Sequence, residues 1–442
     1  MWQERKNWLF RHLPISTYNI LGGYPMKKLF VLLLACLLVV GVFAACTPKE
    51  EAKGSVYYLN FKPEFDTALQ ALAKQYTEKT GIEVKIVTAA SGTYSSSLTA
   101  NIKDVTIFNI GNAAGLADWD EYALDLKDSA IAKELSTNDF NLYNANGELK
   151  AIGNCYESYG IIVNTKLLKQ AGYELSQITN FETLKACVED IHARAAELGF
   201  DAFTTSGLQD SSSWRFSGHL ATLPLHYEGI DSNVATIKGT YLNLFKNVWD
   251  LYINNAAADP TTLTGESDAA AEFKTGKAVF YQNGTWEYSG LKEAGMSDED
   301  LAMIPIYCGA AGEENAALCS GTENRWAINA KASEADQKAS IDFLVWLVSD
   351  PDAAAVYVEN MGAVPFKNAP ASTNKFVNDG NAMLANGKTS ISWAFNYTPN
   401  VDAWRATVVT ALAAYSAGTA EWSAVVTAFV DGWAYEYGVV NG

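Results

Sequence analysis

The fold is decided within Ser55–Val87, where the sequence reads SVYYLNFKPEFDTALQALAKQYTEKTGIEVKIV. The run Val56–Leu59 is rich in residues that favour strands. Apolar residues then recur at helical spacing within Phe65–Tyr76, Gly81 follows as a helix stop, and Ile82–Ile86 alternates as a second strand. A strand, a helix and a strand in this order predict an α/β protein whose parallel sheet is covered on both faces.

The loops that leave this sheet are rich in hydrogen-bonding side chains. A further strand is predicted at Val105–Phe108, after a Ser/Thr-rich connection. In parallel sheets, ligands bind at the carboxyl ends of the strands. Asn60, Thr93, Tyr94 and Asn112 lie in the loops after these strands, so we expect them at a binding site.

A second α/β segment begins with Tyr159–Asn164 and indicates a second domain. Asn180 is a predicted N-cap, an apolar stripe runs through Leu184–Leu198, and Gly199 ends that helix. Further helices are predicted at about 236–256, 333–348, 351–361, 402–416 and 420–436. The chain from Ser55 onward is too long for one typical domain and suits two.

The N-terminus has the features of an export signal. Lysines follow Met26, an uncharged apolar run fills Leu29–Ala45, and small residues precede Cys46. The small-small-Cys ending resembles the lipobox of bacterial lipoproteins, which implies that the Cys46 thiol receives a diacylglyceryl group and becomes the mature N-terminus. We therefore predict an export signal at residues 1–45, of which 1–25 precede a better start at Met26, and a lipidated cysteine with a flexible tether at 46–54. An uncleaved anchor helix is the alternative, which the small residues disfavour.

The chain is strongly acidic, with a net charge of −18. Removal of residues 1–45 takes away five Lys/Arg and one Glu and leaves −22. Contacts to phosphates need basic patches, so we expect no nucleic-acid binding. Anionic lipid headgroups would also repel such a chain, so acyl chains on Cys46, rather than charge, must hold it at the bilayer.

The remaining cysteines are Cys155, Cys187, Cys308 and Cys319. Outside the cytosol these thiols can oxidise, and four cysteines allow three pairings. Cys308 and Cys319 flank a Gly-rich loop and are the predicted disulfide. Cys187 lies on the apolar face of a predicted helix, which favours a buried free thiol.

Catalytic and metal-binding motifs are absent from the sequence. There is no Gly-x-Ser-x-Gly, no phosphate loop, no Gly-x-Gly-x-x-Gly and no His-Glu-x-x-His. His192, His219 and His226 lack the spacing of metal ligands. We therefore predict no cofactor, no metal and no enzymatic activity. A carboxylate pair of the glycosidase type is the alternative, and the sequence does not locate one.

Aromatic residues beside polar ones indicate the kind of ligand. A sugar presents an apolar face and a rim of hydroxyls, so its site needs flat aromatic surfaces with polar partners. Core packing is the commoner role of any single Trp, and we assign Trp249, Trp346 and Trp422 to the core. The predicted ligand-binding residues are Trp286, Trp404, Asn283, Glu323, Asn60, Thr93, Tyr94, Asn112, Glu157, Trp214, Arg215 and Trp393.

The chain resembles the extracellular solute-binding proteins of carbohydrate ABC importers, the group that includes maltose-binding protein, over essentially all of residues 54–442. The resemblance rests on the lipobox and on the order of several segments, which are Ile82–Val84, Tyr159–Asn164, Phe273–Phe280 leading to Asn283–Trp286, Gly362–Pro365 and the terminal helix containing Trp404. One departure is the segment Ser95–Asp104, which is shorter than in relatives.

This resemblance implies a two-lobed fold of the type II periplasmic-binding-protein kind, with crossover strands between two α/β lobes. The expected lobes are residues 55–160 with about 327–366, and 161–326 with about 367–442. The ligand would lie in the cleft, lined by Asn283–Trp286 and the Trp404 region. The expected partners are a sugar or oligosaccharide, the membrane subunits of an ABC importer and the lipid bilayer, and we expect a monomer.

These features predict an extracytoplasmic, lipid-anchored protein that captures a sugar and delivers it to an importer. A solute-binding protein for a peptide or polyamine is the first alternative, and an extracellular glycosidase is the second.

Overall fold

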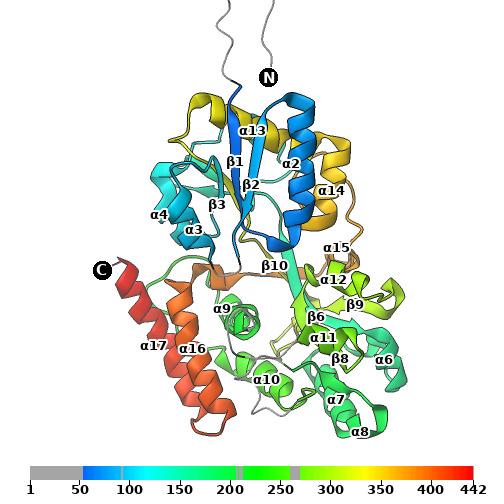
Figure 1. The fold of residues 1–442 in the computed structure, drawn as a ribbon. Helices are drawn as coiled ribbons and strands as arrows, with labels where there is room; N and C mark the ends of the chain where they lie inside the picture. The colour runs from blue at the N-terminus through cyan, green and yellow to red at the C-terminus, as the bar shows by residue number, and fades with distance from the viewer. Residues whose placement is uncertain (1–52, 91–92, 206–207, 209–212, 259–268, 442) are drawn as a thin grey trace, which may run out of the picture. The chain divides into compact units, whose positions relative to one another are not determined.

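The structure is a computed structural model that describes residues 53–90, 93–205, 208, 213–258 and 269–441. The predicted export signal, Cys46 and most of the tether lie outside the described residues. The described part of the chain forms one compact unit that begins at Lys53. It contains two six-stranded sheets, each with helices packed against it (Figure 1).

The first sheet contains the βαβ unit that the sequence predicts. Its strand order is β2 (Glu83–Thr88), β1 (Ser55–Asn60), β3 (Ile107–Asn109), β11 (Arg325–Ile328), β5 (Leu149–Gly153) and β4 (Leu142–Tyr143). Strand β1 runs parallel to β2 and β3, whereas β11 is antiparallel to both β3 and β5. The predicted parallel sheet is therefore confirmed for the N-terminal strands, and β11 enters it from a distant part of the chain.

Helices cover both faces of this sheet, as predicted. Helices α2 (Asp66–Thr80), α5 (Ala130–Lys133), α13 (Glu334–Ser349) and α14 (Pro351–Met361) pack on one face, and α3 (Tyr94–Asn101) and α4 (Ala113–Trp119) pack on the other. In β1, Val56 and Tyr58 face the first group of helices while Leu59 faces the second. The short segment Ser95–Asp104 fills its corner by burying Leu98 and Ile102.

Helix α2 shows why the local pattern was readable. Leu69, Leu72, Ala73 and Tyr76 are buried along one stripe. Gly81 ends the helix in the left-handed region, with φ 72°, and its N–H donates to the Thr77 carbonyl at 2.8 Å. A residue with a Cβ would be strained at that φ, which explains the glycine.

The second sheet has the strand order β12 (Thr389–Ser392), β10 (Ala316–Gly321), β6 (Glu157–Asn164), β8 (Ala278–Gly284) and β7 (Asp201–Phe203), with β9 (Leu301–Ile304) also paired to β6. Its helices are α6 (Thr165–Gln170), α7 (Phe181–Ala193), α8 (Ala195–Leu198), α9 (Thr222–Tyr227), α10 (Leu242–Ile253), α11 (Ala269–Lys274), α12 (Glu287–Glu293), α15 (Lys375–Ala385), α16 (Val401–Ser416) and α17 (Trp422–Asn441). The predicted cap of α7 is confirmed, because the Asn180 side chain accepts from the Thr183 N–H at 2.9 Å.

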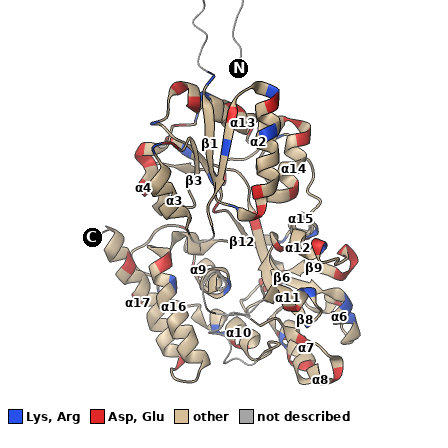
Figure 2. Ribbon diagram, in the orientation of Figure 1, with Lys and Arg blue, Asp and Glu red and all other residues tan. Residues whose placement is uncertain are grey.

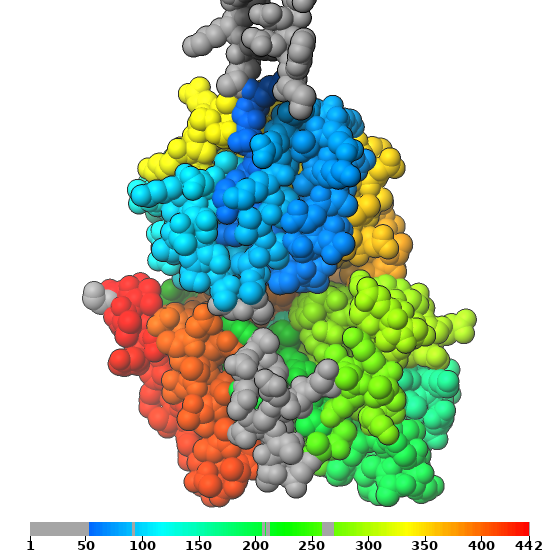
Figure 3. Space-filling model, in the orientation of Figure 1, coloured from blue at the N-terminus to red at the C-terminus, as the bar shows by residue number. Residues whose placement is uncertain are grey.

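The chain passes between the two sheets at residues 154–156, 322–324 and 362–374. We call the elements of the first sheet, up to 153 and again from 325 to 361, the first lobe, and the rest the second lobe. In the space-filling view, the yellow and gold residues after β11 lie with the blue N-terminal residues of the first lobe (Figure 3). The predicted boundaries at 160/161 and 326/327 fall inside β6 and β11, which belong whole to the second and first sheets.

The predicted disulfide is wrong in this structure, where Cys308 and Cys319 are free and buried, like Cys155 and Cys187. A buried carboxylate organises the loop instead. Glu313 accepts from the N–H groups of Phe181 at 2.7 Å, Cys308 at 2.7 Å and Gly309 at 2.8 Å. Burial raises the pKa of Cys308 to about 12, so the thiol has little thiolate with which to react.

Candidate functional site

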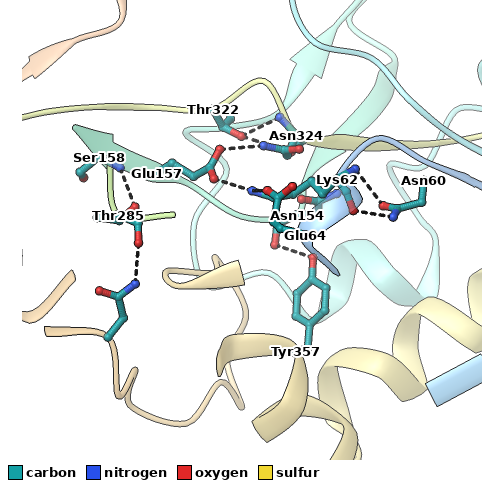
Figure 4. Close-up of polar contacts among 11 residues, drawn as sticks. Asn60, Lys62, Glu64, Asn154, Glu157, Ser158, Thr285, Thr322, Asn324 and Tyr357 are labelled. Carbon is teal, nitrogen blue, oxygen red and sulfur yellow. Dashed lines mark hydrogen bonds and ion pairs between the residues drawn. The ribbon is translucent and has the colours of Figure 1, made fainter. Parts of the chain in front are cut away.

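A buried ion pair joins the two lobes at their first crossing (Figure 4). Lys62 follows β1 and Glu157 begins β6, and the Lys62 ammonium contacts the Glu157 carboxylate. The other Glu157 oxygen accepts from the Asn324 amide at 3.0 Å, and Asn324 lies in the second crossing. We call Lys62, Glu157 and Asn324 the crossover triad, because it ties the loop after β1 to the first residue of β6 and to the second crossing.

The loop after β1 is built to hold the Lys62 ammonium in place. Asn60 donates from its amide to the Lys62 carbonyl at 2.7 Å and accepts from the Lys62 N–H at 3.1 Å. Glu64 adds a second carboxylate at 3.2 Å from the ammonium. Burial alone would lower the pKa of Lys62, but Glu157, Cys155 and Glu64 together outweigh it, and the pKa lies above its usual range.

An aromatic row lies on the face of the second sheet that carries the Tyr159 side chain. Its members, in order of contact, are Trp286, His219, Tyr159, Trp393, Phe395 and Trp214. The ring centroids of neighbours are 4.0 to 5.9 Å apart. Trp214, His219 and Trp286 are partly exposed, whereas the middle of the row is buried. The row therefore offers flat apolar surface at both of its ends.

Trp286 and Trp393 each pack against a glycine, and a Cβ at that position would clash with the indole. A Cβ on Gly284 would come within 2.2 Å of the Trp286 ring, and one on Gly321 within 2.5 Å of the Trp393 ring. Trp286 therefore folds back over the end of β8 and packs against the edge of the core, which leaves the side chain partly exposed. The sequence Asn283-Gly284-Thr285-Trp286 predicted that Trp286 leaves the strand, but not that its ring packs over Gly284.

His219 was missed in the sequence, where the histidines were examined only as metal ligands. It stacks on Tyr159 with ring centroids 4.0 Å apart, and its Nδ1 lies 3.2 Å from the Gln282 amide nitrogen. Burial, together with the charge of Arg215, lowers the pKa of His219 to about 3. The imidazole is therefore neutral at neutral pH, with Nδ1 accepting from Gln282, which leaves its proton on Nε2 to donate.

Charged side chains gather beside the row. Glu323 lies in the second crossing, within electrostatic reach of Glu157, Arg325, Asp402 and Arg405. Burial, with repulsion from Glu157, raises the pKa of Glu323 to about 7. This carboxyl group therefore carries its proton for part of the time at neutral pH and can donate as well as accept.

Arg405 connects this charged group to the end of the aromatic row. Its guanidinium lies 3.8 Å from the ring centroid of Trp214 and donates to the hydroxyls of Ser213 at 2.7 Å and Ser217 at 3.2 Å. A guanidinium stacked on an indole in this way fixes both groups. Trp214 and Glu323 are thus brought together with Arg405.

The candidates from the first lobe are mostly engaged within the protein. Asn60 is 1% exposed, and its amide donates hydrogen bonds to the Lys62 carbonyl and the Thr88 hydroxyl. The Tyr94 hydroxyl accepts from the Asn109 N–H at 2.6 Å, while its ring meets the edge of Phe61 at 5.4 Å. Phe61 is 37% exposed and is a more accessible aromatic than any candidate listed for this lobe.

Thr93 and Asn112 have local roles beside this aromatic pair. Thr93 is exposed and its hydroxyl donates to the Ala90 carbonyl at 2.8 Å. Asn112 caps α4, where its side chain accepts from the Gly115 N–H at 2.8 Å. Asn60, predicted to bind ligand, is instead a turn residue, because its hydrogen-bonding groups are all used inside the fold.

The prediction for Trp404 is wrong. Its side chain is completely buried, its indole N–H donates to the Phe429 carbonyl at 2.9 Å, and its ring packs between Phe429 and Trp433. Trp404 therefore holds α16 to α17. Trp393 is 6% exposed and donates its indole N–H to the Cys319 carbonyl at 3.0 Å. It is therefore a buried member of the row and offers little surface to a ligand.

Asn283 points to the opposite face of the second sheet from the row, because it pairs with Gly160 while Tyr159 pairs with Gly284, and Arg215 lies near Tyr281 on that other face. The Asn283 amide donates to Glu287 at 3.1 Å, and the Arg215 guanidinium lies 5.6 Å from the Tyr281 ring centroid. Both side chains are buried.

Acidic residues are spread over both lobes (Figure 2). In the part of the chain that the structure describes, no group of three or more His, Cys, Asp or Glu residues could hold a metal ion. Within the same residues, no helix combines the length and apolarity that crossing a bilayer requires.

Two α/β lobes joined by repeated crossings, with polar and aromatic side chains where they meet, define the two-lobed class of solute-binding proteins. The chain belongs to the family of bacterial extracellular solute-binding proteins, which it matches over residues 71–386. The predicted family and fold are therefore confirmed. No curated protein sequence matches the chain.

Solved structures of the same fold cover nearly all of the described chain. RafE of Streptococcus pneumoniae in complex with raffinose has a TM-score of 0.66 at 16% identity, over 88% of this chain and 100% of RafE. The GacH receptor of Streptomyces glaucescens, solved with acarbose, has a TM-score of 0.66 at 18% identity, over 88% and 99%. A chitin oligosaccharide binding protein has a TM-score of 0.63 at 16% identity, over 88% and 99%.

The crossover triad generates the first prediction. Lys62→Met or Glu157→Gln should each lower the free energy of unfolding by about 3–5 kcal/mol, because each leaves a buried charge or polar group without its partner. The double variant should lose less than the sum of the two, which urea unfolding of all four proteins measures as a double-mutant cycle.

The exposed pair Lys79–Asp350, 2.8 Å apart, is the matched control. Lys79→Met should cost no more than about 1 kcal/mol, because water already solvates that ammonium. Strictly additive losses for Lys62→Met and Glu157→Gln would contradict the coupling.

Glu323 generates a pH-dependent prediction. Its pKa is raised from 4.5 to about 7 in the folded protein, so the folded state holds a proton that the unfolded state has released. The wild type should therefore lose stability relative to Glu323→Gln as the pH rises from 4.5 to about 7, and the difference should be constant above that. Chemical unfolding of both proteins across this range measures the difference, and a flat difference through the window would contradict the raised pKa.

Proposed function

We propose that this protein captures a sugar or short oligosaccharide between its two lobes and delivers it to an ABC importer, with no chemistry of its own. The observation that carries the proposal is the Trp286 indole, which packs over Gly284 and is partly exposed. Stacking on an indole suits the apolar face of a pyranose.

Polar groups along the aromatic row support a hydroxylated ligand. Neutral His219 can donate from Nε2, partly protonated Glu323 can donate or accept, and Arg405 can donate. A hydroxyl needs both kinds of partner when it is buried, since an unpaired polar group costs free energy. The similar structures RafE, GacH and the chitin oligosaccharide binding protein are named for sugar ligands, which points the same way.

The direct test is a ligand screen followed by substitution of Trp286. Raffinose, acarbose and chitin oligosaccharides, with amino acids and polyamines as comparators, would be screened by thermal shift. Trp286→Ala should weaken the best sugar by about 2 kcal/mol or more, roughly 30-fold, and Trp286→Phe should restore part of the affinity because it keeps a flat ring.

Trp404→Ala is the matched control, because it removes an indole from the core. It should cost about 3–5 kcal/mol of fold stability, whereas Trp286→Ala should leave the melting temperature of the free protein nearly unchanged. Binding of amino acids or polyamines but not sugars would overturn the sugar assignment, and hydrolysis of an oligosaccharide by the pure protein would overturn the absence of chemistry.

We propose further that acyl chains on Cys46 anchor the protein outside the cytoplasm. The family is extracellular, and the apolar run before Cys46 has the form of an export signal. More than one acyl chain is needed for stable attachment to a bilayer. The tether after Cys46 would then hold the lobes near an importer.

The anchor predicts a defined fate for one variant. Cys46→Ala should leave the protein unprocessed or release it into the medium, since the acceptor thiol is gone. Cell fractionation would show the change in location, and mass spectrometry of the wild type should show a lipid-modified Cys46 at the N-terminus. An unmodified Cys46 in the mature wild-type protein would refute the anchor.

A further inference from the structure

A cavity of about 470 Å³ lies on the other side of the second sheet from the crossover triad. Successive residues of β6 point to opposite faces. Glu157 and Tyr159 face the triad and the aromatic row, and Ser158 between them lines this cavity. We call it the rear cavity; its volume is within the range of pockets that hold small molecules.

Hydroxyl groups form one wall of the rear cavity. Ser158, Ser320 and Ser390 stand on the neighbouring strands β6, β10 and β12. The Ser158 and Ser320 hydroxyl oxygens are 2.8 Å apart, and Ser390 reaches Ser320 at 3.5 Å. Each hydroxyl has one donor and two acceptor positions, so this row retains hydrogen-bonding capacity after these contacts.

Another part of the lining is aromatic and consists of Phe140 from the first lobe and Tyr156 from the first crossing. Phe140 and Tyr156 stack with ring centroids 4.8 Å apart and an interplanar angle of 10°. Leu318 and Leu384 add apolar surface from the second lobe. A flat apolar surface together with a row of hydroxyls matches a compact ring or chain that has both apolar C–H groups and hydroxyls.

Charge excludes other ligand classes. None of the described residues lining the cavity is Lys, Arg or His, and the carboxylate among them is Asp139, which is exposed. An anion would find no cation there, and burial of an unpaired charge is costly. The lining therefore selects neutral molecules.

Arg325 links Phe140, which lines the rear cavity, to the loop before α4. The Arg325 guanidinium donates to the Phe140 carbonyl at 2.7 Å and also to the Gly111 carbonyl, which precedes the α4 cap. Since the lining combines Phe140 of the first lobe with Ser158, Ser320 and Ser390 of the second, an occupant of the cavity would contact both lobes. Any effect of this occupant on the main ligand must be reciprocal.

We propose that the rear cavity is a second binding site, for a small neutral polyol, separate from the site of the transported solute. The binding site itself goes beyond the proposed function and does not depend on it; only the linkage between the two ligands does.

The test uses glycerol, xylitol and myo-inositol as probes, with the full chain observed by saturation-transfer difference NMR. At least one probe should give a signal. Ser390→Phe, which places a ring inside the cavity, should abolish that signal. Thr389→Phe is the control, because Thr389 precedes Ser390 on β12, is exposed and does not line the cavity.

Trp286→Ala separates the two sites. The probe signal should survive this substitution, because Trp286 does not line the rear cavity. No signal from any probe would overturn the proposal. A signal that survives Ser390→Phe and disappears in Trp286→Ala would also overturn it, because the polyol would then occupy the main site, a result that leaves the proposed function standing.

Discussion

The buried contact between Lys62 and Glu157 is the interaction on which the arrangement of the lobes depends. A charged pair out of water is tolerated only when its remaining hydrogen-bonding positions are filled. Here the Asn324 amide donates a hydrogen bond to the second Glu157 oxygen, and the turn formed by Asn60 holds Lys62 in place. The contact therefore brings the end of β1, the start of β6 and the second crossing to one point, and each of these segments leads to a group at the candidate site.

The site follows from this point by simple alternation along strands. Tyr159, two residues after Glu157, carries the middle of the aromatic row, and Ser158 between them faces the rear cavity. Glu323 precedes Asn324, so the crossing that completes the triad also delivers the carboxyl group with the raised pKa. A ligand held at the aromatic row and Glu323 would be covered if the first lobe closed over it, as in hinge closure around a ligand.

Local features of the structure were predictable from sequence, whereas long-range choices were not. The helix from Asp66 with its Gly81 stop, and the Asn180 cap, depend on residues a few positions apart. Lys62 and Glu157 are 95 residues apart, so no local sequence pattern predicted their ion pair.

The same limit explains the errors. Trp286 and Trp404 both stand beside polar residues, and only the packing of α16 on α17 separates the buried indole from the accessible one. A disulfide was predicted to close the loop between Cys308 and Cys319. The Glu313 carboxylate holds this loop instead, by accepting hydrogen bonds from its backbone N–H groups. The central claim, that the lobes hold a sugar between them, is tested most directly by small-angle X-ray scattering with and without the best sugar from the screen. The account predicts a smaller radius of gyration at saturation, and an unchanged radius with ligand bound would contradict it.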